Sequence, residues 1–288
     1  MEYRAITTEG FEDYELIDSG DGRKLERFGE FLLDRPDPQS LWPKNNPKIW
    51  EDADAVFHWK EKGERWKVLK NLPETWNIKF ENLIFSLSLK QLKHIGIFPE
   101  HAEQWLEMKN ICGKEQGLRV LNLFGYTGAA SIVAASEGAK VTHVDACIVA
   151  IAILKENQKL SKLPKDSIRM VCEDAIKYIK RLISRKEEFD VIVMDPPAFG
   201  RGPKGEIWKI EEHLSELIKL IPSILSKDAR LVILNGYAAG YSSRTFGELL
   251  VSALKGFNGE ITYGDTGIRE KDSERILSSG IYAKWQRR

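Results

Sequence analysis

The chain has 288 residues, with 43 basic and 43 acidic side chains. This length is enough for one large domain and a smaller one. The balanced charge excludes a protein that coats nucleic acid through overall basicity, so any contact with RNA must be local. The three cysteines, Cys112, Cys147 and Cys172, lack metal-ligand spacing, and their odd number is typical of a reducing compartment. No run approaches the ~20 apolar residues of a membrane span, and the first residues lack a signal-peptide core. We therefore expect a cytoplasmic protein without a metal site.

The first ninety residues alternate apolar and polar side chains in short runs that Gly, Pro and Asp interrupt. Such alternation predicts an antiparallel β module. Residues 35–47 carry four prolines and predict a long ordered loop. The same region holds five tryptophans: Trp42, Trp50, Trp59, Trp66 and Trp76. These rings fit the core of a small β domain or, where cations flank Trp66, a stacking platform for unpaired RNA bases.

A strand, a glycine turn and a helix follow one another near the middle of the chain. Residues 118–124 are a short apolar run, Gly125 and Gly128 bracket a tight turn, and residues 129–135 favour a helix. This pattern predicts the first βα unit of a doubly wound sheet. A ligand at the turn would meet the free N–H groups and the positive dipole end of the helix, where glycine lets the backbone come close.

The next predicted strands lie at residues 140–145, 168–172 and 189–194, with helices at 148–160 and 175–185 between them. Each of these strands leads into acidic residues: Asp145, then Glu173 and Asp174, then Asp195. Carboxyl ends of parallel strands meet at the edge of the sheet where ligands bind. Asp145 also lies 20 positions beyond Gly125, where dinucleotide folds place a ribose-holding acid. The pattern therefore indicates a nucleotide-type cofactor site.

The remaining segments complete the predicted sheet. Helices are expected at residues 102–111, 213–225 and 243–254, and strands at 230–235, near 260–263 and at 280–285. Residues 198–208 form a glycine-rich basic stretch directly after a strand end, which predicts a loop able to close over a substrate. Residues 265–275 are predicted to be a charged loop.

Several of these motifs resemble those of class I S-adenosylmethionine-dependent methyltransferases: residues 122–128, Asp145, Asp174 and Asp195-Pro-Pro. Most of the chain is similar to the large-subunit ribosomal RNA methyltransferase family, whose members modify cytosine C5 or guanine. Residues 14–23 and 92–100 also resemble segments of family members. The resemblance implies an α/β fold with a Rossmann-like seven-stranded methyltransferase sheet and a smaller N-terminal β-rich domain. We expect residues 1–91 to form the β-rich domain, with a role in substrate recognition, and residues 92–288 to form the S-adenosylmethionine-binding domain.

The resemblance also implies which residues form the site. The expected cofactor-binding residues are Phe98, Asn122, Phe124, Gly125, Tyr126, Thr127, Gly128, Asp145, Ala146, Glu173 and Asp174. Asp145 would accept hydrogen bonds from ribose hydroxyls, and Asp174 or Glu173 from the adenine amino group; helix capping is the alternative for Asp145 and Asp174. The expected catalytic residues are Asp195, Pro196 and Pro197, since consecutive prolines remove donors and leave carbonyls directed at a base. The expected substrate-binding residues are Phe199, Arg201, Asn235 and Tyr237.

The ends of the fourth and fifth predicted strands lack a cysteine, and this absence indicates which kind of atom accepts the methyl group. Methylation of cytosine C5 requires a thiolate that adds at C6, from the end of the fourth or fifth strand. The fourth strand continues Asp195-Pro-Pro-Ala-Phe, and the fifth continues Asn235-Gly-Tyr-Ala, where cytosine-modifying relatives carry a Thr-Cys-Ser-like run. We therefore predict a nitrogen acceptor, most simply on guanine of ribosomal RNA.

Two other functions share this pattern. An NAD-dependent oxidoreductase is disfavoured because the turn lacks the first glycine of Gly-x-Gly-x-x-Gly and because Asp-Pro-Pro has no place in hydride transfer. A non-catalytic RNA-binding or assembly protein could retain the fold. The intact acids at three strand ends argue against it.

Overall fold

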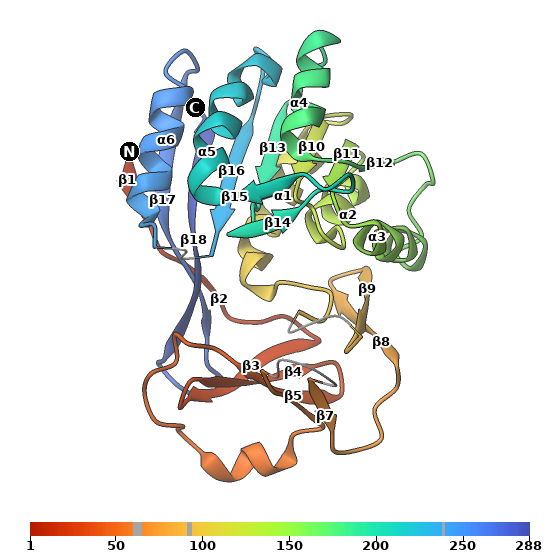
Figure 1. Ribbon diagram of the computed structural model, residues 1–288, viewed down its shortest axis with the longest axis vertical. Coiled ribbons are helices and arrows are strands. Elements are labelled where there is room, and N and C mark those ends of the chain that lie inside the picture. Colours follow the sequence, from red (N-terminus) through yellow and green to blue (C-terminus); the bar gives the residue numbers. More distant parts are fainter. Residues whose placement is uncertain (60–64, 91–93, 238–239) are drawn as a thin grey trace. The chain divides into compact units, whose positions relative to one another are not determined.

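The computed structural model of the chain describes residues 1–59, 65–90, 94–237 and 240–288 (Figure 1). It divides into a large unit, comprising Met1–Ile6, Glu103–Thr266 and Gly280–Arg288, and a small unit, comprising Thr7–Ala102 and Gly267–Ser279. The expected boundary between residues 91 and 92 and the start of the 92–100 motif lie outside the described residues. By their contacts, residues 94–102 and 267–279 group with the small unit, and residues 1–6 with the large one.

The large unit is built on a mixed sheet in the order β1–β17–β18–β16–β13–β10–β11–β12, with β2 also paired to β17. The strands are β1 (Glu2–Tyr3), β2 (Ile6–Thr8), β10 (Arg119–Leu123), β11 (Lys140–Asp145), β12 (Ile168–Cys172), β13 (Val191–Met194), β16 (Leu231–Gly236), β17 (Gly259–Arg269) and β18 (Ile276–Arg287). The strands from β12 to β16 pair in parallel, and β18 is antiparallel to β16. Every residue of β13 and β16 is buried, as expected of central strands that are covered on both faces.

Helices cover both faces of this sheet (Figure 1). They are α1 (Ala102–Lys114), α2 (Ala129–Ser136), α3 (Ile148–Leu160), α4 (Ala175–Ser184), α5 (Ile210–Leu220) and α6 (Ser243–Ala253). Apolar residues of α4, α5 and α6 form one core with alternate strand residues such as Leu121, Ile192 and Val232. This alternation is why the short apolar runs of the sequence became strands. None of the described helices is both long and apolar enough to cross a membrane.

Most predicted elements of the large unit are confirmed, and β11, β12 and α3 match their predicted bounds to the residue. Three details were wrong. The predicted loop 198–208 contains the hairpin β14 (Phe199–Arg201) and β15 (Ile207–Lys209). The predicted loop 265–275 begins as strand, since β17 continues to Arg269, and only residues 270–275 connect β17 to β18. The predicted helix 213–225 begins at Ile210 and gives way to a 3-10 turn, Ile221–Ile224, because Pro222 cannot continue α-helical hydrogen bonding.

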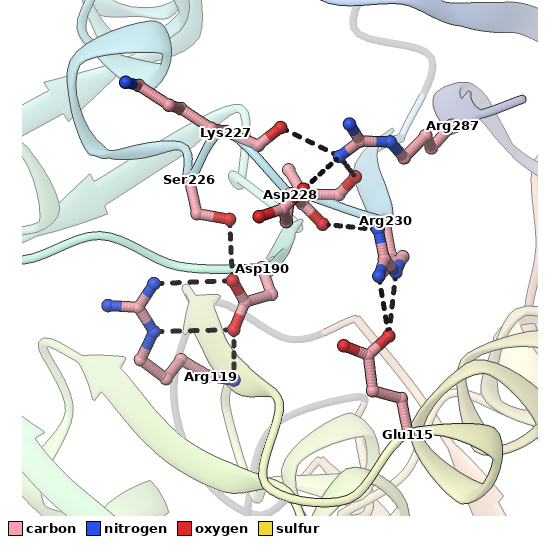
Figure 2. Close-up of polar contacts among 9 residues, drawn as sticks. Glu115, Arg119, Asp190, Ser226, Lys227, Asp228, Arg230 and Arg287 are labelled. Atoms are coloured by element: carbon pink, nitrogen blue, oxygen red, sulfur yellow. Dashed lines mark hydrogen bonds and ion pairs between the residues drawn. The ribbon is translucent and has the colours of Figure 1, made fainter.

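A polar network joins the strands at their amino ends (Figure 2). Asp190, before β13, accepts hydrogen bonds from the backbone N–H of Arg119 at 2.8 Å and from Ser226 Oγ at 2.6 Å. Burial opposes ionisation of Asp190, but these donors outweigh it and lower its pKa. Beside it, Arg230 pairs with Glu115 at 2.8 Å, and Arg287 donates to the Lys227 carbonyl. The network therefore fixes the sheet at the edge opposite the strand-end acids.

The small unit contains a five-stranded sheet, β3–β4–β5–β6–β7, and a separate hairpin, β8–β9. The strands are β3 (Tyr14–Gly20), β4 (Arg23–Phe28), β5 (Phe31–Pro36), β6 (Ala55–Phe57), β7 (Trp66–Val68), β8 (Thr75–Phe80) and β9 (Leu83–Ser88). The prediction of a wholly antiparallel module was wrong, because β5 and β6 pair in parallel. Residues 37–54 make this possible, since a parallel neighbour requires a long crossover. The proline-rich stretch forms part of that crossover, with a 3-10 helix at Pro47–Asp52.

The tryptophans of the small unit divide between core and surface. Trp50 and Trp76 are buried, and their indole N–H groups donate to Asp18 Oδ2 at 2.7 Å and to the Phe28 carbonyl at 3.1 Å. The side chain of Trp59 is 64% exposed. Trp42 and Trp66 are half-buried. The core interpretation is therefore confirmed for Trp50 and Trp76.

Two buried carboxyl groups join residues 267–279 to the five-stranded sheet. Asp18 accepts hydrogen bonds from Trp50 and from the backbone N–H groups of Asn45 and Asn46. Burial opposes ionisation of Asp18, but these donors lower its pKa. Burial, and then the neighbouring Asp18, raise the pKa of Glu270 to about 7. Ser19 Oγ donates to Glu270 at 3.0 Å.

Candidate active site at the carboxyl edge of the large sheet

The turn between β10 and α2 has a strained backbone. Phe124, Tyr126 and Gly128 all adopt positive φ, at 56°, 53° and 86°. For the two residues other than glycine this conformation costs about 1–3 kcal/mol each. Hydrogen bonds hold the turn, with Gly125 N–H donating to the Val144 carbonyl at 3.1 Å and Gly128 N–H to the Gly125 carbonyl at 3.0 Å. Such strain is typical of a site where the backbone itself meets a ligand.

A buried polar chain supports the turn from below. The Asn122 amide donates to Ser131 Oγ at 3.0 Å, and Ser131 Oγ lies 2.9 Å from His143 Nδ1. Burial lowers the pKa of His143 to about 3, so its imidazole is neutral. Gly125 lies so close to this ring that a Cβ atom would be 2.3 Å from His143 Cε1. Asn122, predicted to contact the cofactor, is thus buried beneath the turn.

Asp145, at the end of β11, holds the turn from the side. Its Oδ2 accepts a hydrogen bond from the Tyr126 N–H at 2.7 Å, and its Oδ1 from the Cys147 N–H at 2.8 Å. Burial raises the pKa of Asp145, and the backbone donors counter this in part. The N-cap residue of α3 is Cys147 and not Asp145. Each carboxylate oxygen has a second lone pair, so Asp145 can also accept from a ligand.

The acids after β12 both have partners within the chain. Asp174 is the N-cap of α4 and accepts from the Lys177 N–H at 2.9 Å. The capping alternative for Asp174 is therefore observed. Glu173 forms an ion pair with Arg181, and its N–H donates to the Asp145 carbonyl at 3.1 Å. This last bond places the ends of β11 and β12 side by side.

Asp195-Pro-Pro leaves the sheet next to the glycine turn. The Asp195 N–H donates to the Leu123 carbonyl at 3.3 Å, and Pro196 is buried while Pro197 is exposed. The Pro197 carbonyl accepts a hydrogen bond from Trp208 Nε1 at 2.7 Å. Trp208 ends the stretch that the sequence predicts to be a loop, and no local signal in the sequence indicates this contact.

The predicted substrate-binding residues differ in exposure. Phe199 is 55% exposed and Tyr237 is 41% exposed, and Arg201 is exposed on β14. Asn235 is 3% exposed, and its amide forms two reciprocal hydrogen bonds of 2.8 Å with Gln104 of α1. Phe98, predicted to bind the cofactor, belongs to the small unit, where its ring centroid lies 4.9 Å from that of His94.

The adjacent ends of β12, β11, β10 and β13 thus bring together Asp174, Asp145, the glycine turn and Asp195. A strained turn with helix N–H groups behind it and a hydroxyl-accepting carboxylate beside it is suited to a nucleoside-containing cofactor. The described cysteines do not flank Asp195. Cys147 caps α3, and the thiol of Cys172 donates to the Ala146 carbonyl at 3.5 Å.

Known proteins are similar to this chain in sequence and in fold. Residues 101–233 match the family described as Conserved hypothetical protein 95. The solved SAM-dependent methyltransferase from Agrobacterium tumefaciens is 39% identical, covers 99% of this chain and 94% of its own, and superposes with a TM-score of 0.95. SMU.776, solved in complex with SAH, is 20% identical with a TM-score of 0.73 over 95% of this chain and 75% of its own, which shows the fold alone.

The curated relatives are larger proteins. The ribosomal RNA large subunit methyltransferase K/L of Shewanella oneidensis is 34% identical over 153 residues, which are 52% of this chain and 21% of the relative. The chain spans less than half the length of the first curated relatives that it matches. The fold and the full-length similarity define a class I S-adenosylmethionine-dependent methyltransferase. This chain belongs to that family, and it is related in sequence to the ribosomal RNA large subunit methyltransferases.

Proposed function

We propose that the protein binds S-adenosylmethionine and transfers its methyl group to a base of ribosomal RNA in the cytoplasm. The observation that carries the proposal is the order of the glycine turn, Asp145, Asp174 and Asp195 at the ends of four adjacent strands. The full-length similarity to a SAM-dependent methyltransferase supports the cofactor. The similarity of about half the chain to ribosomal RNA methyltransferases supports the substrate class.

The donor half of the site would consist of the glycine turn and the first two strand-end acids. Asp145 would accept from the ribose hydroxyls with the lone pairs that Tyr126 and Cys147 leave open. Asp174 would accept from the adenine amino group with the oxygen that does not cap α4. Main-chain groups of residues 124–128, with Ala146 beside them, would surround the methionine moiety. The expected Rossmann-like seven-stranded methyltransferase sheet would then correspond to β10–β13 and β16–β18, to which β1 and β2 add at the β17 edge.

The acceptor half would consist of Asp195-Pro-Pro and the hairpin that follows it. A nitrogen of guanine would attack the methyl carbon in line with the carbon–sulfur bond, which breaks to leave a thioether. The nitrogen then loses its proton to Asp195 or to water. Such a displacement depends chiefly on alignment and exclusion of water. Phe199 and Arg201 are exposed beside this path and suited to contact a base and a phosphate.

A nitrogen acceptor is favoured over cytosine C5 because no cysteine follows β13 or β16 in the sequence. C5 methylation needs a thiolate beside the base. Cys147 and Cys172 lie with Asp145 and Ala146 on the donor half. For the small unit we propose a role in RNA recognition, supported by its exposed Trp59.

Calorimetric titration with S-adenosylmethionine and with NAD tests the cofactor. We expect heat of binding with the first compound and none with the second. Transfer of a radiolabelled methyl group to ribosomal RNA from cells that lack this protein tests the activity, followed by nucleoside analysis. RNA that carries 5-fluorocytosine is the control for the acceptor atom, because a C5 enzyme would be trapped on it as a covalent adduct. Recovery of that adduct would refute a nitrogen acceptor, and binding without transfer would favour a non-catalytic RNA-binding protein.

A further inference from the structure

Trp208 is a buried anchor within an exposed hairpin. It lies on β15, which pairs with β14 directly after Asp195-Pro-Pro. Its side chain is only 4% exposed, whereas its neighbour Ile207 is 49% exposed and Phe199 on the partner strand is 55% exposed. The hairpin therefore presents two apolar side chains outward and inserts one indole inward.

The indole N–H of Trp208 holds the segment that follows Asp195-Pro, on the acceptor side of the proposed site. It donates to the Pro197 carbonyl at 2.7 Å. The residue before β14 is held to the start of α5 as well, since the Ile210 N–H donates to the Ala198 carbonyl at 3.0 Å. Pro197 itself is exposed, so this hydrogen bond sets the direction of a peptide group that apolar packing does not fix.

The ring of Trp208 also contacts the glycine turn, through Phe124. Its centroid lies 4.8 Å from that of Phe124, at an interplanar angle of 58°, and 5.6 Å from that of His213, which is stacked at 29°. Aromatic pairs of this kind stabilise a structure beyond the effect of their burial alone. Phe124 is one of the two residues in the turn that hold a strained φ. The side chain of Trp208 thus contacts both the segment after Asp195-Pro-Pro and the glycine turn.

The far end of the hairpin is attached less firmly. Glu206, in its turn, pairs with Lys177 of α4 at 2.5 Å. The Lys177 side chain is 55% exposed and the Glu206 side chain 14% exposed, so the lysine end of this pair is open to solvent, which weakens an ion pair. Trp208 is the residue of the hairpin that reaches both Pro197 and Phe124.

We propose that Trp208 is a positioning residue for methyl transfer, which holds the Pro197 carbonyl and the Phe124 ring at a set separation. This inference rests on the proposed function, because it assigns Pro197 to the acceptor side and Phe124 to the donor side. In-line displacement is sensitive to such a separation, since a shift of about 1 Å can cost ~10²-fold in rate. Loss of the N–H should thus lower turnover with little effect on cofactor binding.

The test compares Trp208→Phe with Trp285→Phe. The first variant keeps an aromatic ring but removes the donor to Pro197. The second is a matched control, because Trp285 is 2% exposed and its Nε1 has no hydrogen-bond partner among the described residues. Trp285 also pairs with Val232, near the start of β16, away from the strand-end acids.

We expect Trp208→Phe to lower kcat on RNA about 10–100-fold, with the Kd for S-adenosylmethionine changed less than threefold. Trp285→Phe should leave kcat within about twofold. Unchanged kcat in Trp208→Phe would overturn the inference, as would parallel losses of kcat, cofactor affinity and thermal stability.

If Trp208→Phe fails to fold, β-(3-benzothienyl)alanine at position 208 keeps the ring shape and replaces N–H by sulfur, with the same expected result. Wild-type protein that transfers no methyl group would overturn the proposed function and this inference together; an active wild type with an equally active variant would overturn the inference alone.

Discussion

Gly125→Ala is the substitution whose effect follows most directly from the geometry of the cofactor turn. A Cβ atom at this position would lie 2.3 Å from His143 Cε1, 2.6 Å from His143 Nδ1 and 2.9 Å from Asn122 Nδ2. Carbon atoms in favourable contact are about 3.5–4.0 Å apart. His143 cannot retreat easily, because it is fully buried and hydrogen-bonded to Ser131. The turn must move instead.

Overpacking of this kind costs about 1–3 kcal/mol. For a unit of this size each kcal/mol lowers Tm by about 2–4 °C. The displaced turn should also weaken S-adenosylmethionine binding at least tenfold, which is about 1.4 kcal/mol. The Gly125 backbone is outside the left-handed region, so the effect is one of contact and not of φ.

Thermal unfolding and calorimetric titration of the same samples measure both effects. Gly256→Ala is the control, because a Cβ atom there meets nothing within 4 Å and its φ is also outside the left-handed region. The control should stay within about 0.5 kcal/mol of wild type. Adding His143→Ala to Gly125→Ala should cost less than the sum of the two single changes, since they share one contact. The reasoning would be refuted if Gly125→Ala bound cofactor and melted like the control.

Four further outcomes are expected. Asp145→Ala should weaken S-adenosylmethionine binding by about 1.5–3 kcal/mol in calorimetric titration, and unchanged affinity would remove Asp145 from the site. Asp195→Ala should lower turnover far more than cofactor affinity in steady-state assays, whereas equal losses would indicate a structural role. Asn235→Ala should destabilise the large unit by about 1–3 kcal/mol in urea, because it leaves the Gln104 amide buried and unpaired; replacing both by Leu should recover most of this loss, and no recovery would contradict the pairing. The raised pKa of Glu270, about 7 against an ordinary 4.5, means that the folded state binds this proton more tightly, so stability should fall as pH rises between these values. Urea midpoints across that range should fall for wild type and stay flatter for Glu270→Gln, and equal slopes would exclude Glu270 as the cause.

Local patterns in the sequence were sufficient to predict the parallel half of the large sheet. The bounds of β11, β12 and α3 were predicted to the residue, because apolar runs and the residues that end them are signals over a few neighbours. The same signals failed to predict the direction of pairing between two strands that no short turn connects. The parallel pairing of β5 with β6 depends on a crossover of many residues, and alternation alone is the same for either direction.

The site was predictable as a set of positions and less so as a set of contacts. The strand-end acids stand together because parallel strands align their ends. The partners of Asn235 and Glu270 were not predictable, because Gln104 is 131 residues from Asn235 and Ser19 is 251 residues from Glu270. Trp208 was missed for a similar reason: its environment arises from the hairpin, which the glycine-rich composition had indicated to be a loop.

Neither unit is contiguous along the chain. The small unit combines residues 7–102 with 267–279, and the large unit combines residues 1–6, 103–266 and 280–288. β17 and β18 each contain residues of both units. A ribosome must therefore synthesise nearly all of these residues before either unit has its full set of strands, and such long-range pairings form slowly. Fragments that end before residue 267 would leave both units unfinished: the edge of β16 would be open to pairing with other chains, and the small unit would lack the bridge between Leu16 and Glu270.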